Sequence, residues 1–181
     1  CYVIHCELFD NIPGKPFAYW ISSSLVRNFA SFKKFFQENR TAKMGLSTAD
    51  DFRFVRTSFE VAASDNNRWK WFAKGGEFAR FYYRMNLLVR WSGLSNTREE
   101  LYSFSYAAVR NPSYYLKPGI TWPHRGHMFS AQFVAPGAVF SVSGKMAFAP
   151  IQELFFLCSL FNSKIINSYL ELSSGETRKS N

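Results

Sequence analysis

Side chains capable of polar chemistry gather in three short stretches of this 181-residue chain, at 43–56, 74–80 and 122–127. Lysine and arginine donate to phosphate oxygens, arginine also donates in pairs to guanine, and aspartate accepts from the cytosine amino group. The candidate nucleic-acid contacts are therefore Lys43, Ser47, Thr48, Asp50, Asp51, Arg53, Arg56, Lys74, Arg80, His124, Arg125 and His127. The alternative role of the two aspartates is to cap a helix. The alternative role of each arginine is to form a surface salt bridge.

Other chemistries have less support in these stretches. The glycine-rich segment 74–76 is too short to cradle a nucleotide phosphate, and no GxGxxG, GxxxxGK[ST], HExxH or CxxC pattern occurs. A metal-dependent nuclease would draw on Asp50, Asp51 and Glu77, but no PD…(D/E)xK pattern accompanies them. We therefore expect no catalytic residue, cofactor site or metal site in this chain.

Positive charge is concentrated in one third of the sequence. The chain has 22 Lys and Arg against 13 Asp and Glu, a net charge of +9. Between Arg27 and Arg90 there are thirteen basic and six acidic residues, which gives +7 of that total. Such a patch attracts a phosphate backbone, and an acidic protein partner is the alternative.

The elements that must position these residues alternate between short strands and helices. Strands are expected at 17–21, 69–72, 87–91, 114–116, 120–122, 129–134 and 139–142, the last two joined as a hairpin across the Ala-Pro-Gly turn at 135–137. A short helical turn followed by a strand is expected within 52–61. Helices are expected at 25–36, 98–107, 151–160 and 165–172, and a flexible tail at 173–181. We predict an α+β fold, with a mixed or antiparallel sheet, flanking helices and a C-terminal helical segment.

Length and composition predict a single domain over residues 1–181. The longest nearly apolar run, 154–161, is far shorter than the roughly 20 residues that cross a bilayer, so we expect no membrane partner. An odd count of three cysteines favours a reducing, cytoplasmic setting. A start at Cys1 indicates a fragment of a larger protein.

Five segments, in this order, resemble one protein family. They resemble blocks of large adenine-specific (N6) DNA methyltransferases, of the BREX phage-defence type (PglX-like) and of type IIG restriction-modification systems. The segments are IPGKPFAYW at 12–20, GLSTADDFRF at 45–54, WFAKGGEF at 71–78, YYLKPGITW at 114–122 and LFNSK at 160–164.

The resemblance implies a target-recognition domain that follows the methylase core and binds double-stranded DNA for it. In the family, S-adenosylmethionine and an Asn-Pro-Pro-Tyr motif belong to the core, which would be a partner in the same parent chain. Here the segment Asn111-Pro112-Ser113-Tyr114 lacks the second proline, and no glycine-rich S-adenosylmethionine motif precedes it. The resemblance thus implies that the parent protein methylates adenine and that this chain alone does not.

Overall fold

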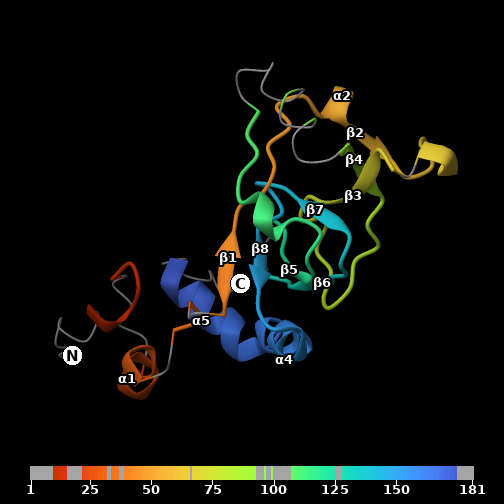
Figure 1. Cartoon of the computed structure of the whole chain (residues 1–181). Coiled ribbons are helices and arrows are strands. Elements are labelled where there is room, and N and C mark those ends of the chain that lie inside the picture. The colour runs from red at the N-terminus through yellow and green to blue at the C-terminus, as the bar shows by residue number, and fades with distance from the viewer. Residues whose placement is uncertain are drawn as a thin grey trace, which may run out of the picture. The chain divides into compact units, whose positions relative to one another are not determined.

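The computed structural model describes residues 10–15, 22–31, 34–36, 39–65, 67–92, 96, 99, 107–124 and 128–174. The chain divides into two compact units, one made of 1–35 with 163–181 and the other of 36–162. The larger unit holds all of the named strands (Figure 1). The predicted α+β class is confirmed, because helices and short strands occur together in antiparallel and mixed sheets.

Two four-stranded sheets make up the larger unit. The first is antiparallel throughout, in the order β1 (Thr41–Lys43), β8 (Met146–Phe148), β5 (Gly119–Thr121) and β6 (Gln132–Val134). The second has the order β2 (Val55–Thr57), β4 (Leu87–Arg90), β3 (Trp69–Ala73) and β7 (Ala138–Phe140), with β3 and β7 parallel.

Aromatic residues from both sheets meet in one core. The ring of Phe140 lies edge-on to Tyr115 at 5.3 Å and to Phe148 at 5.3 Å between centroids. Trp91 lies edge-on to Tyr115 at 5.2 Å. Edge-to-face ring pairs add about 0.5–1.5 kcal/mol beyond the burial of apolar area. These four aromatic residues therefore help to hold the two sheets together.

Short helices connect the strands. The helix α2 (Asp51–Phe54) begins where the Asp50 carboxylate accepts a hydrogen bond of 3.1 Å from the backbone N–H of Arg53. The 3₁₀ helices η2 (Ala63–Asp65) and η3 (Pro112–Tyr114) form single turns. The predicted sequence of a helical turn and then a strand is confirmed by α2 and β2.

The long helix of the larger unit is α4 (Ile151–Phe161), and the Asn162 side chain ties its end to the loop before β6. The Asn162 carboxamide accepts from the N–H of Ala131 at 3.0 Å and donates to the carbonyl of Ala131 at 2.8 Å. It also donates to the carbonyl of Cys158 at 2.9 Å. This buried residue belongs to the LFNSK segment, so that segment fastens the helix to the first sheet.

The smaller unit contains α1 (Ser23–Ser31) and α5 (Lys164–Ser174). Asn28 donates a hydrogen bond of 2.9 Å to the Tyr169 hydroxyl, and Phe29 lies edge-on to the Tyr169 ring at 4.8 Å. Among the described residues, none of the helices has the length and apolar character needed to cross a bilayer.

Three expectations about elements were wrong. The strands β6 and β7 follow each other across a turn but do not form a hairpin, because β6 pairs with β5 and β7 pairs with β3 in the other sheet. Residues 114–116 are not a strand, since η3 ends at Tyr114 and Leu116 has a left-handed φ of 65°. The helix expected at 25–36 ends at Ser31, and Phe36 lies beyond its end with 66% of its surface exposed.

Other expectations fall largely outside the described residues. These are the strand at 17–21, most of the helix at 98–107 and residues 175–181 of the tail, whereas α5 continues to Ser174. The strands at Trp69–Ala73 and Leu87–Arg90 and the helical segment at the end are confirmed.

Candidate nucleic-acid interface

Three loops distant in the sequence are joined by backbone hydrogen bonds. The N–H of Leu46 donates to the carbonyl of Phe140 at 2.8 Å, and the N–H of Val142 donates to the carbonyl of Leu46 at 3.1 Å. The N–H of Ser141 donates to the carbonyl of Ala73 at 3.0 Å. The stretch after β1, the end of β3 and the end of β7 therefore form one junction, which we call the loop junction (residues 45–51, 73–76 and 140–144).

Glycines allow these backbones to approach closely. A Cβ atom on Gly45 would lie 1.9 Å from the carbonyl oxygen of Phe140, and one on Gly144 would lie 2.4 Å from the carbonyl oxygen of Ala73. The Ser141 hydroxyl accepts from the N–H of Gly144 at 2.8 Å, which closes the turn after β7. Two of the segments resembling methyltransferase blocks, 45–54 and 71–78, meet at this junction.

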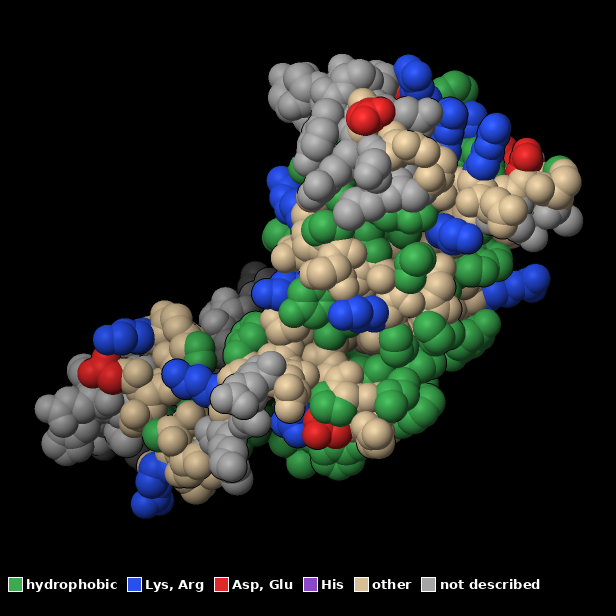
Figure 2. All heavy atoms as spheres, in the orientation of Figure 1, with side chains coloured by type: hydrophobic (Ala, Val, Ile, Leu, Met, Phe, Trp, Pro, Cys, Tyr) green, Lys and Arg blue, Asp and Glu red, His purple; other side chains and the backbone are tan. Residues whose placement is uncertain are grey.

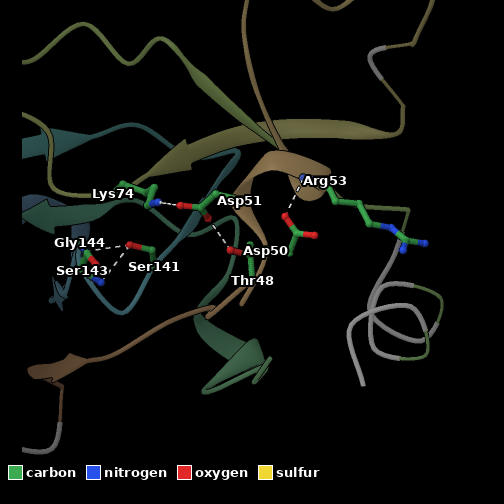
Figure 3. A network of polar contacts seen from close by, with 8 residues as sticks. All are labelled: Thr48, Asp50, Asp51, Arg53, Lys74, Ser141, Ser143 and Gly144. Carbon is green, nitrogen blue, oxygen red and sulfur yellow. Dashed lines mark hydrogen bonds and ion pairs between the residues drawn. The ribbon is translucent and has the colours of Figure 1, made fainter. Parts of the chain in front are cut away.

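The polar centre of the loop junction is a chain of three side chains (Figure 3). The Asp51 carboxylate accepts from the hydroxyl of Thr48 and forms an ion pair with the ammonium of Lys74. Partial burial alone would raise the pKa of Asp51, but the hydrogen bonds from Lys74 and Thr48 and the charge of Lys74 lower that pKa overall. Asp51 thus stays ionised and links the first predicted stretch to the second.

The side chains of the two arginines near α2, Arg53 and Arg56, point in different directions. Figure 3 shows the Arg53 side chain extending away from the Asp51–Lys74 pair, while its backbone N–H is held by Asp50. The Arg56 guanidinium turns back on its own segment and donates to the carbonyls of Phe52 and Val55. Its Cζ atom lies 5.9 Å from the centre of the Phe52 ring, an arrangement of the cation–π type.

The remaining predicted contacts lie at several places. The Lys43 ammonium lies 5.7 Å from the centre of the Tyr114 ring, and the Arg80 guanidinium lies 5.9 Å from that of Phe78. Ser47 exchanges two backbone hydrogen bonds of 2.9 Å with Ala108. The exposed His124 belongs to the third stretch, whereas Arg125 and His127 lie outside the described residues.

Part of the third stretch approaches the loop junction through its backbone. The carbonyl oxygen of Trp122 lies 2.9 Å from the position of a Cβ atom on Gly75, and the Cα atom of Pro123 lies 3.2 Å from it. The structure therefore brings the start of the 122–127 loop next to the 74–76 turn.

The surface around α2 and β2 carries much of the visible basic charge. Figure 2 shows Lys and Arg side chains gathered over this end of the larger unit, with a few acidic side chains among them. Within the part of the chain that the structure describes, no three His, Cys, Asp or Glu side chains are grouped to hold a metal ion. Asp50 caps α2 and Asp51 binds Lys74, so both carboxylates have structural partners.

Two contributors to the site escaped sequence reasoning. The Ser141–Gly144 turn lies where a strand was expected to continue, although a Ser-Gly pair at 143–144 is itself a turn signal. The Asn111 carboxamide donates to the carbonyl of Met44 at 2.9 Å, and Asn111 has a left-handed φ of 51°. Asparagine is one of the few non-glycine residues that adopt this conformation readily, so the Asn-Pro pair was a usable signal.

The sequence is similar to those of adenine-specific methyltransferases. It is 27% identical over 186 residues to the adenine-specific methyltransferase PglX of Lacticaseibacillus casei (strain Zhang), a match that covers 92% of this chain. It is 27% identical over 190 residues to the adenine-specific methyltransferase BrxX of Escherichia coli O9:H4 (strain HS), covering 94% of this chain. No family model matches the chain.

These matches support a relationship between this chain and the methyltransferases PglX and BrxX. The matched region is 15% of the length of each of these relatives. The similarity therefore concerns one region of a much longer protein.

Proposed function

We propose that this chain is the target-recognition domain of an adenine-specific DNA methyltransferase of a phage-defence or restriction-modification system. In this proposal it holds duplex DNA in position for a catalytic domain in the same parent chain, in the cytoplasm. That catalytic domain binds S-adenosylmethionine, and the chain described here contributes no catalytic residue.

The observation that carries the proposal is the similarity along 92% of the chain to proteins named as adenine-specific methyltransferases. Two of the segments resembling methyltransferase blocks meet at the loop junction, beside the basic surface around α2 and β2. A basic surface with polar loops is the arrangement that binds a phosphate backbone and reads base edges.

The structure suggests different tasks for the predicted contacts. Asp51 and Lys74 neutralise each other, so their role is to fix the loop junction. The exposed Arg53 follows Asp51 and the exposed Arg80 follows Lys74 in the sequence, and both side chains have the chemistry to contact phosphate or guanine.

An alternative is a scaffold whose basic surface binds an acidic protein. The two candidates differ in their ligand, which a competition experiment separates. Bound duplex DNA should not be displaced by polyglutamate of equal charge if sequence or duplex shape contributes to binding, whereas an acidic-protein site would accept either polyanion.

The decisive test is an exchange of segments. The region of the PglX methyltransferase that matches this chain would be replaced by residues 1–181, and the adenines methylated in bacterial DNA would be mapped by single-molecule sequencing. A target-recognition domain should change the methylated sequence motif, because base contacts carry the specificity.

A matched control would exchange a segment of equal length outside the matched region. Methylation of the original motif by the main hybrid, at an unchanged level, would contradict the proposal. A hybrid that fails to accumulate would be replaced by one that exchanges only residues 36–162, the larger compact unit.

A further inference from the structure

A shallow groove of about 450 Å³ lies on the larger unit beside β3 and β4. The residues that line it include Val61, Trp69, Lys70, Trp71, Leu88 and Leu116. No acidic residue is among the described residues that line it. The groove is therefore lined mainly by aromatic and apolar residues, with Lys70 as its one basic residue among those described.

The strand register aligns this groove with the basic surface. Leu88 on β4 is directly opposite Arg56 on β2 and also directly opposite Trp71 on β3. Directly opposed residues of antiparallel strands point to the same face, and neighbouring strands are about 4.8 Å apart. Arg56, Leu88 and Trp71 thus form one row across the sheet.

Two aromatic residues, Trp71 in this row and Phe52 beside Arg56, are exposed. Trp71 is 43% exposed, and Phe52, whose ring lies 5.9 Å from the Arg56 Cζ atom, is 90% exposed. Large aromatic side chains are normally buried in the core, so the exposure of Trp71 in the same row as Arg56, and of Phe52 beside the Arg56 guanidinium, indicates a binding surface.

One wall of the groove is held in a strained conformation. Leu116 has a left-handed φ of 65°, which is rare for a bulky residue. Two hydrogen bonds of 2.9 Å fix it, from the N–H of Leu116 to the carbonyl of Ala138 and from the N–H of Gly137 to the carbonyl of Leu116. Such strain concentrates at ligand-binding positions.

We propose that this groove binds unpaired nucleotides of DNA, with a base stacked on Trp71 and the backbone phosphates beside Arg56. Aromatic faces accept any base by stacking, and basic side chains follow the phosphates, which is how single strands are held without sequence preference. The inference deepens the proposed function and rests on it: duplex DNA that binds at the loop junction delivers a locally unpaired strand to the groove.

The test uses the whole chain and fluorescence of its tryptophans. The probes are a 24-base-pair duplex, the same duplex with a three-thymine bulge, and an oligothymidine of ten nucleotides. The bulged duplex and the oligothymidine should quench tryptophan emission on binding, and Trp71→Phe should remove most of this quenching. Trp91→Phe is the matched control, since Trp91 is buried in the core and does not line the groove.

Two further variants separate stacking from simple filling of space. Trp71→Tyr keeps an aromatic face and should retain affinity for the bulged duplex within about threefold. Trp71→Leu removes that face and should weaken binding about tenfold, while both variants bind the fully paired duplex within about twofold of wild type. Circular dichroism spectra would show that both variants are folded.

If the bulged duplex quenched the tryptophan emission of the wild-type and Trp71→Phe chains equally, the inference would be overturned. Equal affinities of Trp71→Tyr and Trp71→Leu, or quenching by a neutral proline-rich decapeptide in place of DNA, would also overturn it. If the paired duplex binds and the groove variants change nothing, the inference fails and the proposed function stands. If none of the DNA probes binds, both fail.

Discussion

At the scale of single residues, some charged side chains near α2 bind neighbouring residues of the same chain, whereas others are exposed at the surface. The Asp51 carboxylate accepts a hydrogen bond from Thr48 and forms an ion pair with Lys74, and Asp50 caps α2. These two aspartates were candidates for reading cytosine or for capping, and the structure documents the capping role for Asp50. Their use in DNA recognition stays a prediction, as it does for every predicted contact.

The Asp51–Lys74 pair should stabilise the chain in a pH-dependent way. The side chains of Lys74 and Asp51 are 29% and 51% exposed, so we expect the Asp51→Asn variant to lose about 0.5–1 kcal/mol of unfolding free energy at pH 7. The pKa of Asp51 is lowered in the folded chain, so this contribution is complete above its unfolded pKa and is lost as pH falls through the folded value. Urea unfolding of both chains at pH 7 and at pH 3 measures it.

The difference between the two chains should shrink at pH 3, because Asp51 is then protonated in the unfolded chain and its ion pair with Lys74 forms only if that proton is released. Lys74→Met provides the second edge of a double-mutant cycle, and the double variant should lose less than the sum of the single variants. A difference that is the same at both pH values would contradict an ionised Asp51 as its source.

At the scale of elements, close backbone approach determines how the loops meet. Gly45 should be the most sensitive glycine of the junction, because a Cβ atom would lie 1.9 Å from the Phe140 carbonyl oxygen. We expect Gly45→Ala to cost about 2–3 kcal/mol of unfolding free energy. The comparison is Gly137→Ala, where nothing lies within 4 Å of the new Cβ atom and only the φ of 102° opposes it. Thermal denaturation of both variants checks this order, and a larger loss in Gly137→Ala would contradict it.

The end of α4 offers a second prediction at this scale. Asn162→Ala removes the partner of the buried N–H of Ala131, so we expect a loss of about 1–3 kcal/mol. Asn162→Asp keeps the acceptor oxygen but removes the donor to the carbonyls of Ala131 and Cys158, and it should also be destabilised. Ser159→Ala on the exposed side of the same helix is the control and should change stability little. If Asn162→Ala unfolded at the same denaturation midpoint as the wild-type chain, the hydrogen bonds of the Asn162 side chain would be dispensable for stability.

Local patterns predicted elements better than they predicted pairing. The aromatic strand at Trp69–Ala73 and the helix Ile151–Phe161 follow from aromatic and apolar runs and from turn residues beside them. The hairpin between β6 and β7 was wrong because a turn signal at 135–137 marks a reversal but does not select which sheet each strand joins. That choice depends on partners distant in the sequence, such as β3 and β5. The Asp51–Lys74 contact is of the same kind, because its two residues are distant in the sequence.

At the scale of the whole molecule, the concentration of positive charge between Arg27 and Arg90 predicts how DNA binding depends on salt. Each neutralised phosphate contributes about −0.9 to the slope of log affinity against log salt concentration. We expect duplex binding by the chain to weaken from 50 to 200 mM salt. Arg53→Ala should reduce the slope by about one if Arg53 touches phosphate, evenly for all sequences. If it reads a base, we expect a loss of about 1–3 kcal/mol and relaxed specificity at one position instead.

The matched control for that measurement is Lys164→Ala, which removes the same charge from an exposed position at the start of α5, outside the basic third. Fluorescence anisotropy of a labelled duplex at four salt concentrations gives the slope for each chain. Arg80→Ala should behave like Arg53→Ala if both stretches contact the same duplex. A slope near zero in the wild-type chain would contradict DNA binding through the basic third. An equal reduction in Lys164→Ala would show that total charge, rather than its concentration near the loop junction, controls binding.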